Sequence, residues 1–347
     1  MPVTIERPSL YSEGPISDLR ERRHRRGIAS HRWRRITIGL VNNMPDAAIA
    51  ATERQFTNVL DAASNEIDIH LKFYTLPQVP RSKEAQALLE KFYSDATALH
   101  GENLDALIIT GSQPIAEDLT HEPYWQALSN LIDWAETNTI STILSCLSAH
   151  AGVLHFSGIR RRRLARKCSG VFTFEVANDH RLTQGASDEW VMPQSRYNEL
   201  DGAELASHGY TILSRSPTVG VDTFVKQMRS LIVFLHGHPE YDHDTLAREY
   251  RRDMSRYLAG DLSVMPRIPE GYFSNDAEQA LKEFCLLAEA ERATETMARY
   301  PEITFGEATR TPWSASTNLL YRNWLALIGE RKTEAGSTIA PVASYGI

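Results

Sequence analysis

The first half of the chain alternates short apolar runs with helix-forming segments, and this alternation constrains the fold more than any other feature. The apolar runs are typical of buried strands, while the segments between them carry apolar residues at helical spacing. This alternation predicts an α/β fold with a mostly parallel central sheet and flanking helices. The expected strands are 36–41, 66–76, 104–114 and 139–145, and the expected helices are 47–64, 81–99, 122–137 and 146–159.

The pattern changes after Lys167, where the apolar runs become shorter and predict added strands, several of them antiparallel. These strands are expected at 170–176, 209–216, 218–227 and 230–242, and later helices at 245–260, 276–300 and 317–330. We therefore predict three parts. They are a basic N-terminal extension (1–35), an α/β catalytic domain (36–260), and a C-terminal, largely helical segment (261–347) packed on that domain.

Composition narrows the possible partners. The net charge of −7 argues against a nucleic-acid partner, and no apolar run has the roughly 18 residues that a membrane span needs, so no membrane partner is expected either. The three cysteines show no CxxC spacing. A disulfide framework or a cysteine zinc site is therefore not expected, and a reduced, cytoplasmic protein is.

Cys146 follows directly after the expected strand 139–145, where the next helix begins. Backbone N–H groups of a first helical turn lack partners, and the helix dipole favours a thiolate there. A strand–nucleophile–helix turn also exposes its side chain. The alternative is a small buried hydrophobe, the usual fate of a free cysteine. Cys168, among basic residues, is the second candidate nucleophile, and Cys285 is expected to be a packing residue on a helix.

A second polar group follows another apolar run, "LIVFL", in the stretch "HGHPEYD". His238 and Glu240 are two residues apart, so in an extended segment they point the same way. Glu240 can then orient His238 as a general base. With Cys146 at the same sheet edge, the arrangement suits acyl transfer through a thioester, and the N–H of Leu147 is an expected oxyanion donor.

Two further features allow other ligands. His236 and His238 with Glu240 or Asp242 could cluster around a metal, but no metal-site spacing is present, so no metal is predicted. The basic runs 20–35 and 160–167 are typical of solvated surface, and the second could also bind an anionic ligand.

Several stretches together resemble the homoserine O-acyltransferase family of the homoserine O-succinyltransferase type. The resemblance covers roughly 36–328 and implies a class I glutamine amidotransferase-like fold. The stretches are "NNMPDAAIAATERQF", "LDALIITGSQP", "YWQALSNLIDWA", "SCLSAHAGVLHFSGI", "RKCSGVF", "PQSRYNEL", "GHPEYDHDTLAREYRRD" and "WSASTNLLYRNWL".

The resemblance implies roles by position. Cys146 matches the acyl-thioester nucleophile, His238 the general base and Glu240 the acid that orients it. Substrate-binding residues are matched by Lys167, Ser195 and Arg252. The planar guanidinium of Arg252 suits the carboxylate of an amino acid, and Glu249 on the same helix is a weaker match for its amino group.

The implied reaction moves an acyl group from acyl-coenzyme A, as co-substrate, to the hydroxyl of L-homoserine in methionine biosynthesis. No permanently bound cofactor is implied, and the family's usual state implies a homodimer. Ile115 occupies the position where succinyl users of the family tend to carry glycine and acetyl users glutamate, so neither pattern applies. The resemblance to the succinyltransferase type favours a succinyl donor, and acetyl stays open.

Two other activities remain as alternatives. The acceptor could be another hydroxy amino acid such as serine. A glutamine amidotransferase-like hydrolase would share the fold, but its usual nucleophile motif is Gly-x-Cys-x-Gly. Here Leu144 and Ser148 flank Cys146 in place of those glycines, which favours the acyltransferase.

Overall fold

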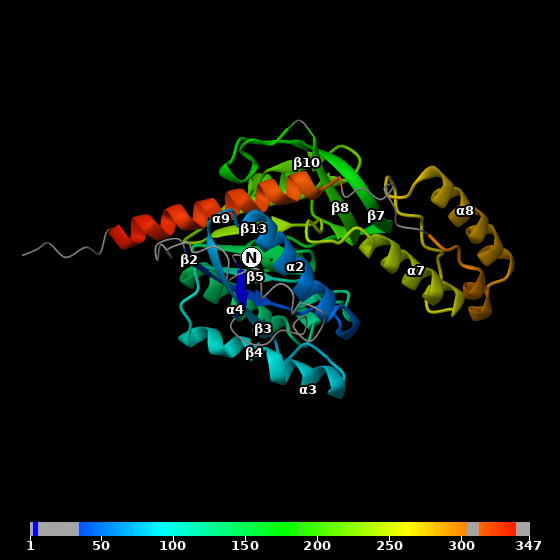
Figure 1. Ribbon diagram of the computed structural model, residues 1–347, viewed down its shortest axis with the longest axis horizontal. Coiled ribbons are helices and arrows are strands. Elements are labelled where there is room, and N and C mark those ends of the chain that lie inside the picture. The colour runs from blue at the N-terminus through cyan, green and yellow to red at the C-terminus, as the bar shows by residue number, and fades with distance from the viewer. Residues whose placement is uncertain (1–2, 6–34, 188, 304–311, 338–347) are drawn as a thin grey trace, which may run out of the picture.

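The computed structural model describes residues 3–5, 35–187, 189–303 and 312–337, and within them a nine-stranded sheet forms the centre of the molecule (Figure 1). The strands run in the order β1-β3-β2-β5-β6-β13-β12-β9, with β4 beside β3. Neighbours from β1 to β13 are parallel, and β12 and β9 are added antiparallel. The predicted α/β fold with a mostly parallel sheet is confirmed. The strands are β1 (Val3–Ile5), β2 (Arg35–Val41), β3 (Asp68–Thr75), β4 (Ser94–Asp95), β5 (Ala106–Ile109), β6 (Ser141–Ser145), β9 (Thr211–Ile212), β12 (Thr223–Gln227) and β13 (Leu231–Leu235).

Helices cover both faces of this sheet because its strands are apolar on both sides. On β5, Ala106 and Ile108 join one buried cluster, whereas Leu107 and Ile109 join another on the opposite face. The first cluster includes residues of α2 (Ile49–Ala63), α3 (Lys83–Phe92) and α9 (Ser314–Ser337). The second includes residues of α4 (Trp125–Asn138), α5 (Leu147–Ser157) and α6 (Gly202–Ser207).

The helix α9 is longer than the expected 317–330 and packs against α2 and β2. Its buried residues recur at helical spacing, which gives one apolar face toward the core. They include Leu320, Tyr321, Trp324, Leu325 and Ile328. The indole N–H of Trp324 donates to Ser141 Oγ at 2.8 Å, so the helix is also fixed to the first residue of β6.

A second, four-stranded sheet in the order β11-β10-β7-β8 lies beside the first and is antiparallel. Its longest strand, β7 (Arg162–Val176), begins within the basic run rather than at 170 as predicted. Its partner β8 (Trp190–Glu199) was not predicted, because polar residues and Pro193 mask its strand pattern. Proline is tolerated there because β8 is at the edge of the sheet.

Two of the expected strands are each divided between the sheets. The segment 209–216 forms β9 and then β10 (Ser214–Ser216), and 218–227 forms β11 (Gly220–Val221) and then β12. Leu213 and Asp222 lie where the chain crosses over. The N–H of Leu213 donates to Thr223 O at 2.8 Å and that of Asp222 to Ser214 O at 3.1 Å. Backbone pairing therefore continues where the chain crosses from one sheet to the other. A continuous run of strand-forming residues in the sequence does not show where such a crossing occurs.

Two of the expected helices were predicted too long. The segment 81–99 ends its helix at Phe92, then forms β4 and a 3₁₀ helix (Ala96–Gly101), where the Asp95 side chain accepts from the N–H of Thr97. The segment 276–300 ends α8 (Asn275–Ala290) before a 3₁₀ helix (Thr294–Arg299). At the first break, a side chain competes for a backbone N–H group. At the second, the helical spacing of apolar residues ends.

The helices α7 (Thr245–Leu258) and α8 lie together at one end of the molecule (Figure 1). They share a small buried cluster that includes Tyr250, Met254, Leu281 and Phe284. At the other end of the sequence, β1 pairs with β3 and buries Val3, a strand that the polar character of 1–35 did not predict. The basic residues 20–34 lie outside the described residues. No helix in the described part of the chain is long and apolar enough to cross a membrane.

Candidate active site

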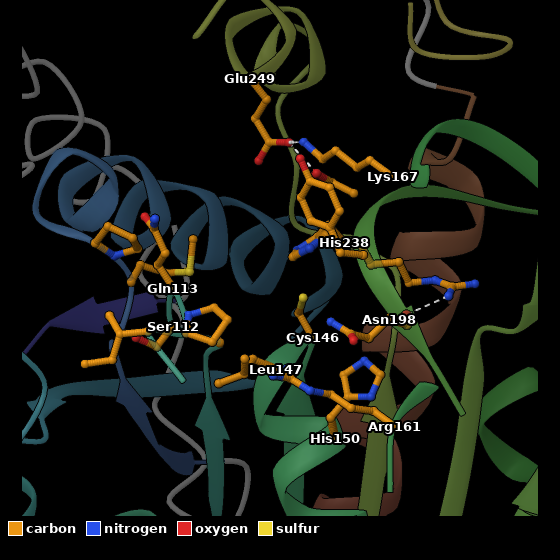
Figure 2. A pocket seen from close by; sticks show the side chains of 18 of the residues that line it. Ser112, Gln113, Cys146, Leu147, His150, Arg161, Lys167, Asn198, His238 and Glu249 are labelled. Carbon is orange, nitrogen blue, oxygen red and sulfur yellow. Dashed lines mark hydrogen bonds and ion pairs between the residues drawn. The ribbon is translucent and has the colours of Figure 1, made fainter. Parts of the chain in front are cut away.

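The ends of two neighbouring parallel strands bring Cys146 and His238 to one edge of the central sheet. Ser145 at the end of β6 is opposite Leu235 at the end of β13. The N–H of Cys146 donates to the carbonyl of Leu235 at 2.7 Å. The residues that follow each strand therefore meet at the carboxyl edge, where ligands bind in sheets of this kind. The expected juxtaposition of cysteine and histidine is present (Figure 2).

The backbone of Cys146 is in an unusual conformation, with φ 52° and ψ −111°. A positive φ at a non-glycine residue costs on the order of 1–3 kcal/mol and is found mostly at functional sites. The sharp turn ends β6, begins α5 at Leu147 and directs the thiol into a cavity. Because Leu147 is the first helical residue, its N–H has no carbonyl partner within α5.

Gly111 leaves space in front of that N–H. A Cβ atom on Gly111 would lie 3.2 Å from the Leu147 nitrogen and 3.5 Å from Cys146 Cβ. A side chain at position 111 would therefore crowd the approach to the N–H group beside the thiol. The region around Gly111, Cys146 and Leu147 has the geometry of a small anion-binding recess.

The His238 ring is held by Glu240 and Tyr241. Nδ1 of His238 is 2.8 Å from Glu240 Oε1, and both residues are about 5–6% exposed. Tyr241 stacks on the imidazole with ring centroids 4.3 Å apart. Burial opposes a charge on His238, but the Glu240 carboxylate and a hydrogen bond to Cys146 outweigh it and hold the pKa of His238 well above its usual range. The geometry therefore favours an imidazolium beside the sulfur.

Above His238, a network of charges connects the predicted substrate-binding residues; it is mostly buried, and Arg252 forms its exposed edge. Glu249 on α7 accepts from Lys167 Nζ at 3.3 Å, from the Tyr241 hydroxyl at 2.8 Å, and from Ser195 Oγ. Burial raises the pKa of Glu249, but Lys167 and Ser195 outweigh this and lower it. The Glu249 carboxylate is therefore charged at neutral pH, as an ammonium ligand would require.

Asp253 completes this network one turn further along α7. It accepts from Lys167 Nζ at 2.9 Å and from Arg252 Nε and Nη2 at 3.1 and 3.0 Å. Burial alone would lower the pKa values of Lys167 and Arg252, but the two carboxylates raise both. The structure thus brings Lys167, Ser195 and Arg252 together around Glu249 and Asp253.

On the opposite side of Cys146, His150 and Arg161 line the same cavity (Figure 2). His150 is one helical turn after Cys146 and stacks on His236, with ring centroids 4.7 Å apart. Burial lowers the pKa of His150 well below its usual value, and the neighbouring His236 and Arg161 lower it further. The ring of His150 is therefore neutral.

The histidine ring at position 236 does not join a metal-binding group. Burial and Arg196 lower the pKa of His236 to about 3, and its Nδ1–H donates to the carbonyl of Val221 at 2.8 Å. Among the described residues, no three His, Cys, Asp or Glu side chains are grouped so that they could hold a metal ion.

The cavity has a volume of about 690 Å³, and its rim includes the loop around Ile115. The Ile115 side chain is 72% exposed, and its N–H and that of Ala116 donate to Glu122 Oε1 at 2.8 Å. Ile115 therefore lies at the mouth of the cavity rather than against the thiol. Cys168 and Cys285 are outside the lining of the cavity, and burial raises the pKa of each thiol.

Sequence reasoning gave no individual role to several residues of this cavity, among them Tyr241, Asp253, His150 and Arg161. Tyr241 and Asp253 lie inside motifs that were recognised, "GHPEYD" and "EYRRD", but they were assigned no role. His150 lies in "SCLSAHAG", where its spacing of four from Cys146 on a helix was an available signal. Arg161 belongs to the basic run 160–167, whose alternation of inward and outward side chains was not predicted.

Known proteins are similar to this chain over most of its length. A family profile described as homoserine O-succinyltransferase matches residues 19–334. Curated homoserine O-succinyltransferases are similar. One from Rhodopseudomonas palustris is 47% identical over 84% of this chain and 87% of its own length. Others from Bradyrhizobium japonicum and Methylorubrum extorquens are 44% and 43% identical, over 85% and 86% of this chain and 90% and 88% of theirs.

Solved structures of lower similarity were also found. A glutamine amido transferase from Methylobacillus flagellatus has a TM-score of 0.47 at 13% identity, and covers 85% of this chain and 95% of its own. A glutamine amidotransferase from Thermotoga maritima has a TM-score of 0.44 at 13% identity, covering 84% and 98%.

Proposed function

The chain belongs to the homoserine O-succinyltransferase family and is an acyltransferase, and we propose that it moves a succinyl group from succinyl-coenzyme A to the hydroxyl of L-homoserine. The observation that carries this proposal is the half-buried Cys146 beside the buried His238–Glu240 pair, in a cavity that Arg252 and Glu249 also line. The product would be an activated ester for methionine biosynthesis.

The first half-reaction transfers the acyl group to the enzyme. The Cys146 thiolate attacks the thioester carbonyl, and the N–H of Leu147 donates to the oxyanion that forms. The carbon–sulfur bond to coenzyme A then breaks, and the His238 imidazolium gives its proton to the leaving thiolate. Glu240 keeps Nδ1 of His238 protonated, so that Nε2 is the atom that exchanges the proton.

The second half-reaction transfers the acyl group to the acceptor. His238, now neutral, takes the proton of the acceptor hydroxyl, whose oxygen attacks the acyl-thioester carbon. Cys146 leaves as thiolate, which restores the starting state. Arg252 suits the acceptor carboxylate and Glu249 its ammonium group, since an amino acid presents both charges on one carbon. Lys167 and Ser195 would hold Glu249 in place and border the same ligand.

A donor-by-acceptor activity matrix tests this proposal. Succinyl- and acetyl-coenzyme A are each offered with homoserine, serine and threonine, and products are identified by mass spectrometry. We expect the succinyl ester of homoserine to form fastest. Transfer to serine in preference to homoserine would assign another hydroxy amino acid as acceptor. Glutamine hydrolysis without any acyl transfer would instead favour the amidotransferase-like alternative.

Three expectations from the sequence remain predictions. They are the role of Ile115 in choosing the donor, the homodimer and the cytoplasmic location. Light scattering of the purified chain tests the homodimer. Exchanging Ile115 for glycine or glutamate in the same activity matrix tests the role of this residue in choosing the donor. The exposed position of Ile115 at the rim suits a contact with the donor rather than with the acceptor.

A further inference from the structure

Within the basic run 160–167, Arg161 points into the cavity, whereas its immediate neighbours Arg160 and Arg162 point outward. Arg160 pairs with Asp118 at 2.6 Å, and Arg162 pairs with Glu199 at 2.7 Å, both at the surface. Arg161, between them, lines the cavity and is half-buried. Successive side chains of an extended segment point to opposite sides, which explains the alternation. The run is therefore not a uniform solvated patch.

Among the described residues, Arg161 has no carboxylate partner, in contrast to Lys167 and Arg252 in the same cavity. The buried Arg196 also lacks a carboxylate, but its guanidinium donates to Gln194 and to the carbonyls of Asn198 and Val219. Nη2 of Arg161 donates to the backbone carbonyl of Glu117 at 3.2 Å, and within the described part of the chain Arg161 forms no ion pair. Lys167 and Arg252, by contrast, each have a carboxylate within 3.0 Å. A partly buried guanidinium without an anion is costly, so a ligand anion would be stabilising at this position.

The position of Arg161 is close to the reacting sulfur. Burial lowers the pKa of Arg161, while the charges of Tyr124, Glu122 and Cys146 act in the opposite direction. Arginine remains cationic at neutral pH under such shifts. Arg161 and the neutral His150 lie on the side of Cys146 away from His238 and Glu249 (Figure 2). That side of the cavity is free of the charge network that suits the amino-acid acceptor.

From this geometry we propose that Arg161 binds the free carboxylate of a dicarboxylic acyl group, of which succinyl is the example, while its other end reacts at Cys146. The inference rests on the proposed function and extends it to the residue that selects the donor. A succinyl thioester ends in a carboxylate two methylene groups beyond the reacting carbonyl, and an acetyl thioester has none. The planar guanidinium can hold such a carboxylate through two hydrogen bonds.

The phosphates of coenzyme A are the other source of anionic oxygen at this cavity. Arg163 also lines it, but is exposed and lies over the Tyr197 ring at 5.2 Å, and Arg256 lines it from α7. These two arginines also lie within the cavity lining and suit the phosphates of a long donor. The two sources can be separated, because succinyl- and acetyl-coenzyme A carry the same phosphates and differ only in the acyl group.

The test compares kcat/KM for the two donors, with homoserine as acceptor, in the full-length protein and three variants. For Arg161→Ala we expect a loss of about 10- to 100-fold with succinyl-coenzyme A, the size of a charge-assisted hydrogen bond, and under about threefold with acetyl-coenzyme A. Arg161→Lys keeps the charge without the planar fork and should lie between. The control Arg162→Ala, whose side chain points outward, should leave the donor ratio unchanged. Activity with acetyl-coenzyme A reports in each case that the variant is folded.

Equal losses with both donors would overturn the proposal, because they indicate a role with the shared phosphates or in the fold. A wild-type protein that transfers acetyl but not succinyl would also overturn it, while leaving the acyl-transfer function standing. If no acyl group is transferred from either donor, the proposed function fails, and the assignment of Arg161 fails with it.

Discussion

The two sides of the cavity differ in how their charges are balanced. On the Glu249 side, Lys167 and Arg252 are paired with carboxylates that also lie in the cavity. On the Arg161 side, the guanidinium donates only to a backbone carbonyl among the described residues. A balanced set of charges suits a ligand that carries both signs, such as an amino acid, whereas an unbalanced cation suits an anion. Cys146 lies between the two sides, and in the proposed mechanism it takes part in both half-reactions.

Removing the thiol of Cys146 should have the largest effect, because both sides of the cavity depend on it. Cys146→Ala takes away the nucleophile of both half-reactions, so we expect a loss of up to about 10⁶-fold in kcat, the size seen when the nucleophile of a covalent mechanism is removed. The measurement is the rate of coenzyme A release with homoserine present. Cys168→Ala is the matched control and should retain activity, because Cys168 lies outside the cavity lining. Retained transfer by Cys146→Ala would refute the nucleophile assignment.

Weakening the orienting acid should also affect both half-reactions, but less. Glu240→Gln keeps the shape of the side chain and removes the charge 2.8 Å from His238. We expect kcat to fall about a thousandfold to ten-thousandfold, as in related triads. An unchanged rate would show that Glu240 only packs.

The same substitution predicts a pH effect with a definite sign. The raised pKa of His238 keeps the imidazolium present above pH 6.5, and proton donation is lost as pH rises through the folded value. Without Glu240 that pKa falls, so the alkaline limb of kcat/KM for the donor should move to lower pH. A limb that stays in place or moves upward would contradict the assigned coupling.

A substitution at Gly111 should have a smaller effect on kcat. It tests the recess around Gly111, Cys146 and Leu147, which lies between the two sides of the cavity. Gly111→Ala would place a methyl group 3.2 Å from the Leu147 nitrogen. We expect kcat to fall by about 10- to 100-fold with either donor, because the oxyanion donor becomes crowded rather than removed. Gly101→Ala, at a site with open space around it, is the control. Equal activity of the two variants would argue against Leu147 as an oxyanion donor.

Arg252 should give the smallest and the most one-sided effect. Its side chain is 59% exposed, so a bound carboxylate there is partly solvated. Arg252→Ala should raise KM for homoserine about tenfold and leave KM for the acyl donor nearly unchanged. The measurement is a pair of saturation curves, each with the other substrate fixed. Equal effects on both KM values would place Arg252 outside the acceptor site.

The parallel core and the position of Cys146 were predictable because they depend on local pattern. A buried strand that ends in Cys146, and another that is followed by His238, suffice to place both at one sheet edge. The second sheet was only partly predictable. Its strands share continuous runs with the first sheet, and the crossings at Leu213 and Asp222 depend on pairing between distant segments.

The charge balance of the cavity could not be predicted from the sequence. Glu249 was matched to an amino-group role, but its contacts with Lys167, Ser195 and Tyr241 join three different segments of the chain. Arg161 is one of several arginines in a run, and only the direction of its side chain separates it from Arg160 and Arg162. Tertiary packing sets that direction.

The most direct test of the central claim is the intact mass of the protein after mixing with succinyl-coenzyme A in the absence of acceptor. We expect a mass increase of one succinyl group, located on the peptide that contains Cys146 and lost when homoserine is added. A protein that transfers succinyl to homoserine but never carries the group, or that carries it in the Cys146→Ala variant, would contradict a thioester at Cys146.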